Sequence, residues 1–367
     1  MKRFLIIALL MFPFAVSSQY YSTIGQRKRI FRTSLVTQSY SVENVDQSIM
    51  QVTGPTELFY PVSSNFTVQI MNTPGMATYG DSAISGLSDT YIRANYTFLD
   101  NKMLIGLGVG VPSGTNELDA NEFDMSKVLS TDAFRFRLPV FGQGFTVGSG
   151  FAYAHPLSEK FVTGFGVNYV FRAKYNPIKN SVDNYDPGDQ ISTSVGLDVA
   201  VTDNSKLTFD LLYTYYLADK IRGREQFASG SKVCVSAGYL MQAKLWTFYF
   251  SGVLRQKGKN ETWAGTSLKP EVKNSNGPQA EIDGLARYTM NERTGLRILV
   301  ELRAYGENEL KTGDAALFGL GGGVDYNISS VFAITGDLKV LFGRLGGGSN
   351  ASSVTGIESV MGISYMF

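Results

Sequence analysis

The sequence has almost none of the residues that carry redox, metal or histidine chemistry. It contains one Cys and one His among 367 residues, which excludes an intramolecular disulfide, a cysteine metal cluster and a multi-histidine metal site. Lys and Arg number 33 against 32 Asp and Glu, so the basic excess typical of nucleic-acid-binding proteins is missing. We therefore expect no enzyme activity, no catalytic or metal-binding residue, no cofactor and no nucleic-acid partner.

Long apolar runs are also missing beyond the N-terminus, so no helical membrane span is predicted. The one apolar run near the start is Phe4–Val16, which follows Lys2 and Arg3 and precedes small residues. This order is typical of a secretory signal peptide. We predict a signal peptide at 1–18, a short periplasmic segment at 19–29 and a membrane domain at 30–367.

Period-two alternation dominates the sequence from about residue 65 onward. In 161–175, Phe, Val and Tyr occupy one face, and Gly, Asn, Arg and Lys occupy the other. Such segments are about 10–14 residues long, whereas strands of soluble proteins average about 5–6. Long alternating strands suit a bilayer, where closure into a barrel satisfies every backbone group. The predicted fold is all-β: a transmembrane, antiparallel, up-and-down β-barrel.

The connections alternate in length, which predicts short periplasmic turns and long external loops. Short connections near 156–159 and 202–205 alternate with long ones near 176–188, 217–230 and 256–278. Counting back from the C-terminus gives fourteen clear strands, and two weaker candidates lie upstream at 30–42 and 47–61. We predict sixteen strands. The alternative is fourteen strands with an N-terminal plug.

Strand parity assigns many charged residues to the lumen, because Arg or Lys facing lipid costs about 2–4 kcal/mol at the bilayer midplane. Both signs are present, which favours an ion-pair network over a charged selectivity ring. The predicted lumen-lining residues are Arg93, Arg172, Lys174, Asp198, Asp210, Glu281, Asp283, Arg287, Arg297, Glu301, Arg303, Asp325, Asp337, Lys339 and Glu358. An inward glycine wall is predicted from Gly106, Gly108, Gly110, Gly148, Gly150, Gly164 and Gly166.

The longest connection, about 112–142, is unusually apolar for an exposed loop. It contains Phe123, Met125, Leu129 and Phe134. One interpretation is that it folds into the barrel mouth against the glycine wall and narrows the pore. The other is that 134–138 simply extends the following strand above the membrane, and the sequence slightly favours this second interpretation.

Three features that resemble chemical sites have simpler explanations. His155 precedes Pro156 in a short turn and has no evident Ser partner, so we interpret it as an interfacial turn residue. Asp183, Asp186 and Asp189 flank a Pro-Gly pair, and this is ordinary turn chemistry rather than an EF-hand. Cys234 is interpreted as a small inward-facing side chain that fills space.

The last strand places Ile363, Tyr365 and Phe367 on one face. This pattern resembles the C-terminal insertion signal of bacterial outer-membrane barrels, and it implies assembly by the barrel-assembly machinery.

Three segments in the first half carry a second resemblance: Gly86–Thr90, Gly110–Thr115 and Leu138–Gly144. Their arrangement resembles the meta-pathway phenol-degradation (MetA-like) transporters, which are related to the FadL/TodX channels for hydrophobic compounds. The resemblance implies passive uptake of small, hydrophobic or aromatic molecules across the bacterial outer membrane, with membrane lipid and a small solute as partners. The alternative is a structural or adhesion barrel with a closed lumen. The sequence leaves the oligomeric state open.

Overall fold

The computed structural model describes residues 28–43, 47–181, 184–346 and 351–367. The expected signal peptide and most of the 19–29 segment lie outside the described residues. Within those residues, no helix is long and apolar enough to cross a membrane.

The chain forms a closed antiparallel barrel of sixteen strands. Three ring positions are each built from two consecutive strands, separated by a short break. In ring order the strands are β1 (Ile30–Val42), β2 (Ile49–Thr53) with β3 (Thr56–Pro61), β4 (Phe66–Asn72) with β5 (Pro74–Tyr79), β6 (Ser82–Leu87) with β7 (Thr90–Phe98), β8 (Met103–Val111), β9 (Thr146–Pro156), β10 (Phe161–Arg172), β12 (Gln190–Thr202), β13 (Ser205–Tyr216), β16 (Lys232–Ala243), β17 (Trp246–Lys257), β20 (Gln279–Thr289), β21 (Thr294–Tyr305), β22 (Ala315–Asn327), β23 (Phe332–Leu345) and β24 (Ser352–Met366).

The ring closes between the first and last strands. β1 pairs with β24 along its whole length, from Ile30 opposite Met366 to Val42 opposite Val354. The prediction of sixteen strands is therefore confirmed. The alternative of fourteen strands and a plug is wrong, because 30–42 and 49–61 pair within the wall. The break between β2 and β3 falls at Gly54 and Pro55, where proline removes one ladder donor.

Two parts of the wall and its loops differ from the predictions. The hairpin of β5 and β6 extends β4 and β7 as part of the wall, and the alternation in the sequence does not indicate it. It is rich in Gly, Ala and Ser, so its alternation is weak. The predicted loops 176–188, 217–230 and 256–278 contain a small second sheet. Its strands are β11 (Tyr185–Asp186), β14 (Asp219–Ile221), β15 (Arg224–Ala228), β18 (Glu261–Trp263) and β19 (Leu268–Pro270).

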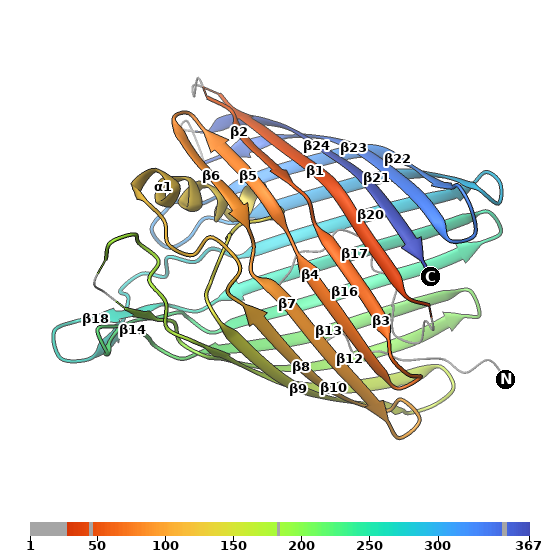
Figure 1. Cartoon of the computed structure of the whole chain (residues 1–367), viewed down its shortest axis with the longest axis horizontal. Coiled ribbons are helices and arrows are strands. Elements are labelled where there is room, and N and C mark those ends of the chain that lie inside the picture. The colour runs from red at the N-terminus through yellow and green to blue at the C-terminus, as the bar shows by residue number, and fades with distance from the viewer. Residues whose placement is uncertain (1–27, 44–46, 182–183, 347–350) are drawn as a thin grey trace.

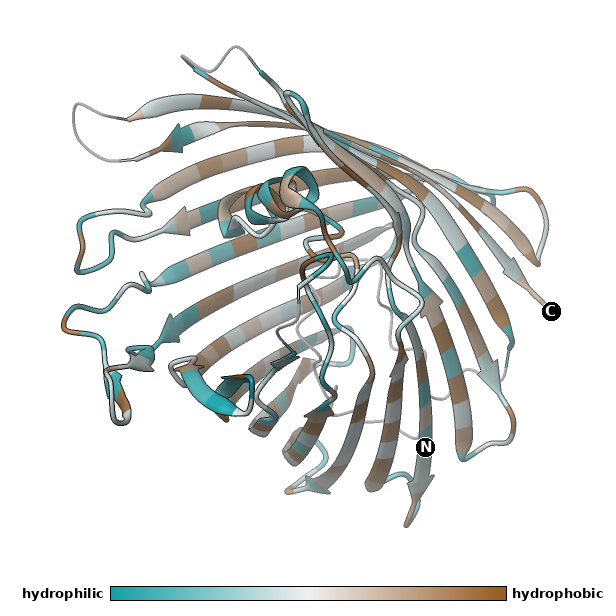
Figure 2. Cartoon of the chain, turned by 60° about the vertical axis from the view of Figure 1, so that its left-hand side comes forward, coloured by the Kyte–Doolittle hydropathy of each residue, from teal (hydrophilic) through white to brown (hydrophobic). Residues whose placement is uncertain are grey.

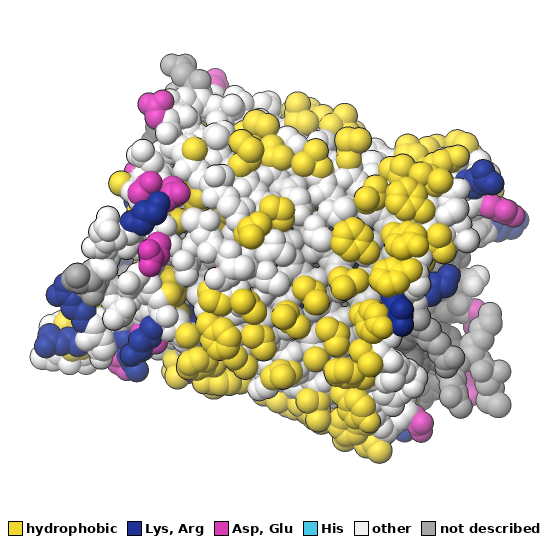
Figure 3. Space-filling model, in the orientation of Figure 1, with side chains coloured by type: hydrophobic (Ala, Val, Ile, Leu, Met, Phe, Trp, Pro, Cys, Tyr) yellow, Lys and Arg dark blue, Asp and Glu magenta, His cyan; other side chains and the backbone are white. Residues whose placement is uncertain are grey.

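The outer face of the barrel is apolar. Side chains such as Phe165, Leu254 and Met361 are about half exposed or more although they are large and hydrophobic. Figure 3 shows apolar side chains over the body of this face, with charged side chains gathered toward its two ends. An exposed apolar surface of this extent is expected against lipid and not against water. Along the strands, hydrophobic residues alternate with less hydrophobic or hydrophilic ones (Figure 2).

The two ends of the barrel carry different structures. One end holds the small sheet and the only helices among the described residues, α1 (Ala120–Leu129) and a short 3-10 helix at Asp132–Phe134. The C-terminus lies at the other end (Figure 1). We call these the external end and the periplasmic end, because the long loops and the short turns are placed in this way in outer-membrane barrels.

Candidate functional site

The predicted charged residues of the last strands share one face. β20 and β21 pair so that Glu281 lies opposite Arg303, and Asp283 lies opposite Glu301. Ile282 lies between Glu281 and Asp283, and Leu302 lies between Glu301 and Arg303; these two apolar side chains are 52% and 41% exposed. Glu301 and Arg303, by contrast, are 4% and 2% exposed. Since successive side chains alternate across a strand, the structure places the charged residues inside the ring and the apolar residues outside it.

Arg303 is the centre of this interior network. Its Nε donates to Glu301 Oε1 at 2.6 Å, and its Nη2 donates to Glu358 Oε1 at 2.8 Å. Its Nη1 donates to the carbonyl oxygens of Ala133 and Phe134 at 3.1 and 2.8 Å. One guanidinium therefore joins two barrel strands to the connection between β8 and β9.

Arg303 and three further cations meet four carboxylates in this network. Arg135 Nη1 lies 2.6 Å from Glu301 and 3.7 Å from both Glu281 and Asp283. Lys339 binds Glu301 and lies 2.6 Å from Glu358. Arg255 lies 2.6 Å from Glu281. The charges balance within the network, which is what a buried charge cluster requires to be tolerated.

A second cluster lies closer to the periplasmic end. Arg297 Nη2 lies 2.9 Å from Asp337 and 3.3 Å from Asp325, and Arg287 Nε donates to Asp325 at 2.9 Å. The Arg297–Asp337 contact is an ion pair without hydrogen-bond geometry, since both atoms lack a hydrogen-bond partner among the described residues.

The other predicted lumen residues do not join these clusters. Asp198 pairs with Lys206 at 2.7 Å. Arg93 lies opposite Gly108, and Asp210 lies opposite Gly196. Arg172 lies opposite Thr146, near the external end of β10. Lys174 lies beyond the end of β10, where its exposed ammonium group is 3.7 Å from Asp186.

The predicted glycine wall falls on three neighbouring strands. Gly106 lies opposite Gly150, and Gly108 lies opposite Gly148, across β8 and β9. Ile105 and Leu107, which precede these two β8 glycines in the chain, are 52% and 51% exposed and point outward. The remaining wall glycines, Gly110 on β8 and Gly164 and Gly166 on β10, share this inward parity. This stretch of the inner surface therefore contributes backbone and almost no side chains.

The connection between β8 and β9 folds into the barrel, and the strand extension favoured by the sequence is wrong. β9 begins only at Thr146. Phe134 ends the 3-10 helix, and Arg135–Leu138 follow it without joining a strand. We call residues 112–145 the inserted segment. Its buried core is shared with other strands and includes no residue of β8–β10, the strands of the glycine wall.

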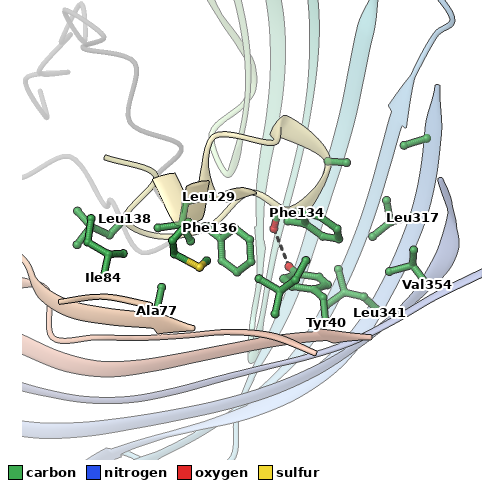
Figure 4. Close-up of a cluster of buried hydrophobic side chains, with 14 of the residues drawn as sticks. Tyr40, Ala77, Ile84, Leu129, Phe134, Phe136, Leu138, Leu317, Leu341 and Val354 are labelled. Atoms are coloured by element: carbon green, nitrogen blue, oxygen red, sulfur yellow. Dashed lines mark hydrogen bonds between the residues drawn. The ribbon is translucent and has the colours of Figure 1, made fainter. Parts of the chain in front are cut away.

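The inserted segment packs against apolar side chains on the other part of the inner wall. Phe134, Phe136 and Leu138 are 4–5% exposed, and Met125 and Leu129 of α1 are almost completely buried. They share a buried cluster with an apolar set from β1, β2, β5, β6 and β21–β24: Tyr40, Ile49, Ala77, Ile84, Tyr305, Ala315, Leu317, Leu341 and Val354. Figure 4 shows part of this cluster, with Tyr40, Leu317 and Leu341 among the labelled side chains. These small and apolar inward residues offer a hydrophobic surface that the glycines lack.

Three buried polar side chains hold the backbone of the inserted segment. Gln51, which is 0% exposed, donates to the carbonyl oxygen of Leu138 at 2.8 Å and accepts from its N–H at 2.9 Å. Gln38 makes the equivalent pair with Arg135 O and Arg137 N, at 3.1 and 2.6 Å. Each amide thus acts like a neighbouring strand and satisfies backbone groups that would otherwise be buried without a partner.

Asp89 makes the third attachment, at the point where the inserted segment leaves and rejoins the wall. Its Oδ1 accepts from Gly114 N at 3.0 Å, and its Oδ2 accepts from Gln143 N at 2.7 Å. Gly114 is required here, because a Cβ would lie 2.3 Å from the carbonyl oxygen of Phe141. The three sequence segments that carry the family resemblance therefore meet at this one carboxylate.

Tyr40 couples the charge network to the inserted segment. Its hydroxyl lies 2.7 Å from the carbonyl oxygen of Phe134 and 2.6 Å from Glu358 Oε1, and it accepts from Arg303 Nη1 at 3.2 Å. Its ring packs against Phe134 and Phe136, with centroids 4.8 and 5.4 Å apart (Figure 4). Sequence reasoning missed Tyr40, Gln38 and Gln51. The available signal was their shared inward parity on β1 and β2.

α1 closes the external end beside β6. Its first turn has a reciprocal cap, in which Glu122 N donates to Asp119 Oδ1 and Asp119 N donates to Glu122 Oε2. On its far edge β6 has no strand partner among the described residues, since β8 ends at Val111. Thr115 N donates to Leu87 O there, and α1 packs against β6. The wall at this point is completed by the inserted segment.

The three features that resemble chemical sites in the sequence, at His155, at the aspartates of the 183–189 loop and at Cys234, have local neighbours. His155 Nδ1 lies 3.1 Å from the hydroxyl of Tyr153 in the same strand. Asp189 accepts from Arg172 N at 3.0 Å and from the hydroxyl of Tyr169, while Asp183 lies outside the described residues. Cys234 lies opposite Leu212 and Arg255. Within the described ranges, no group of His, Cys, Asp and Glu is arranged to hold a metal ion.

No protein-family model and no curated protein matches this chain. Among solved structures, OprB of Pseudomonas putida aligns with a TM-score of 0.51 and 9% identity, over 93% of this chain and 94% of that one. A TodX deltaS2S3 mutant monoaromatic hydrocarbon channel aligns at 0.49 and 12%, over 93% and 91%. The toluene transporter TbuX of Ralstonia pickettii aligns at 0.46 and 13%, over 94% and 91%. The alignment with OprB and the barrel geometry agree: the chain has the fold of a bacterial outer-membrane β-barrel.

Proposed function

We propose that the protein is an outer-membrane channel for passive uptake of small molecules, hydrophobic or aromatic ones among them. The proposal rests on one observation: the ring of sixteen strands is wide, and the inserted segment packs against only part of its inner wall. Eight strands enclose only packed side chains, whereas barrels of about sixteen strands leave an aqueous channel. The buried core of the inserted segment involves β1, β2, β5, β6 and β21–β24 and includes no residue of β8–β10, which carry the glycine wall.

The solute class is supported by the resemblance of three segments to transporters of phenolic and other hydrophobic compounds. Asp89 brings these segments together, because it binds Gly114 and Gln143 across long distances in the sequence. The shared motif is therefore the anchor of the inserted segment. We propose that this anchor sets how far the segment obstructs the path of the solute.

Planar-bilayer recordings of the purified protein test the proposal. We expect discrete conductance steps from the wild-type barrel, and larger steps after deletion of 116–130, which removes α1 and keeps the Asp89 contacts. The heat-dependent shift of folded barrels on SDS gels identifies variants that fold. If both folded proteins stay silent, the lumen is closed and the protein is a structural or adhesion barrel.

A further inference from the structure

Three basic side chains on one part of the inner wall lack the acidic partners found elsewhere in the barrel. Arg172 lies near the external end of β10, and Lys232 and Lys257 lie directly opposite each other on β16 and β17. They alternate with outward residues such as Phe171 and Val233, which are 44% and 39% exposed. We call Arg172, Lys232 and Lys257 the cationic wall.

Within the described ranges, no carboxylate lies within ion-pair distance of the cationic wall. Asp132 of the inserted segment acts on both lysines from farther away, and its carboxylate accepts from Gln279 Nε2 at 2.6 Å instead. The neighbouring Arg255 is occupied by Glu281. Near Arg172, Asp189 accepts from the backbone N–H of that residue and not from its guanidinium.

Two more external carboxylates act on Lys257 from a distance, and both are engaged locally. Asp219 accepts from Tyr185 and from Gly188 N at 2.8 and 2.7 Å. Glu271 accepts from Asn260 N at 2.9 Å. The positive charge of the wall is therefore not cancelled by contact.

An uncompensated lysine pair is costly for a barrel, because like charges directly opposite each other in a sheet are destabilising. The network around Arg303 demonstrates that this chain can pair buried charges: every cation there contacts a carboxylate. Unpaired cations in a confined space raise the local concentration of anions. The cationic wall is thus a feature that packing alone does not explain.

Three tyrosines lie in the neighbourhood of the arginine of this wall. Arg172 lies close enough to Tyr175, Tyr185 and Tyr216 to act electrostatically on their hydroxyl groups. Tyr175 and Tyr185 meet edge to face with centroids 5.6 Å apart, and the Tyr175 ring packs on Gly144 of the inserted segment. Burial raises the pKa of both Tyr175 and Tyr185. They stay uncharged at neutral pH and do not neutralise Arg172.

We propose that the cationic wall is a binding site for small organic anions that pass through the barrel, and that it favours aromatic carboxylates. A carboxylate is attracted by the wall's positive charges, and an aromatic ring can pack between the guanidinium of Arg172 and the tyrosines. This inference rests on the proposed channel function. Asp210 and the Asp198–Lys206 pair lie deeper in the same wall, so anion attraction is strongest at the external end.

Reversal potentials across bilayers with asymmetric salt test the wall directly. With potassium chloride we expect the wild type to prefer anions. The double variant Lys232→Gln, Lys257→Gln should lower the ratio of anion to cation permeability by about three- to tenfold, the range expected for removal of two partly screened charges. Lys160→Gln is the matched control, because Lys160 is exposed in a periplasmic turn. It should leave the ratio unchanged.

The aromatic preference needs a second comparison, of sodium benzoate with sodium acetate. We expect benzoate to be preferred by the wild type, and Arg172→Gln to abolish that preference while conductance remains. An unchanged permeability ratio in the double variant would overturn the proposed anion-binding site. Equal permeability of benzoate and acetate in the wild type would overturn the proposed preference for aromatic anions. Absence of any conductance from folded wild type would instead overturn the channel function.

Discussion

Replacement of Gln51 by Leu should detach the inserted segment from the barrel wall. The Gln51 amide satisfies both backbone groups of Leu138, with bonds of 2.8 and 2.9 Å, and is completely buried. Leucine has a similar volume but no hydrogen-bonding group. The variant therefore leaves the N–H and the carbonyl of Leu138 buried and unpaired for as long as the segment stays inserted.

The expected magnitude follows from these two groups. Each buried backbone group without a partner costs about 1–3 kcal/mol, so attachment is weakened by roughly 2–6 kcal/mol in total. Since about 1.4 kcal/mol is a factor of ten, even the lower bound raises the detached population roughly thirtyfold. The pairing of β2 with β1 and β5 uses main-chain groups and is unaffected by the substitution.

Limited trypsin digestion of the folded barrel measures detachment, because Arg135 and Arg137 lie within the inserted segment. When opening is fast, cleavage follows the population of the open form. Gln69→Leu is the matched control: Gln69 Nε2 donates to Glu57 at 2.6 Å, away from the inserted segment. Equal cleavage rates in Gln51→Leu and the control, or an unchanged bilayer conductance of Gln51→Leu, would show that the Gln51 amide does not hold the inserted segment in place.

Further substitutions test the other supports of the fold. Glu301→Gln removes a carboxylate bound by three cations, and it should lower the free energy of unfolding in urea by about 3–5 kcal/mol; an unchanged midpoint would argue against the network. Asp89→Asn exchanges one acceptor oxygen for an NH₂ group beside two backbone donors. It should increase trypsin cleavage of the inserted segment, and full protection would count against this anchor. Phe367→Ala removes the terminal ring that stacks on Tyr365 at 5.7 Å. The yield of folded barrel in cells should fall, and a normal yield would contradict the predicted insertion signal.

Strand number and strand orientation were predictable because both depend on a local period. A residue such as Ile298 faces lipid and its neighbours Arg297 and Leu299 face the other way, whatever the rest of the chain does. Parity also placed Glu301 and Arg303 on one inner face. The same period is weak in the Gly- and Ser-rich hairpin of β5 and β6, and the short external strands are too brief to display it.

The inserted segment could not be placed because its contacts have no local period. Its apolar residues were visible in the sequence, but Phe134 packs on Tyr40, which is far away along the chain. The glycine wall suggested space for the segment, whereas burial of apolar surface favours the wall that carries Leu317 and Leu341. The inward parity of Gln38 and Gln51 does not reveal their role, since an amide that pairs with a distant backbone resembles any other polar residue on the inner face of a strand.

Swelling of proteoliposomes tests whether the lumen is an open channel, because it reports solute flux through the barrel without any variant. Vesicles that contain the folded protein are placed in isotonic solutions of glycine, phenylalanine, glucose or a large oligosaccharide. We expect swelling well above that of protein-free vesicles for the small solutes, with phenylalanine entering faster than glucose, and none for the oligosaccharide. Swelling indistinguishable from that of protein-free vesicles for every solute would show that the barrel is not a channel.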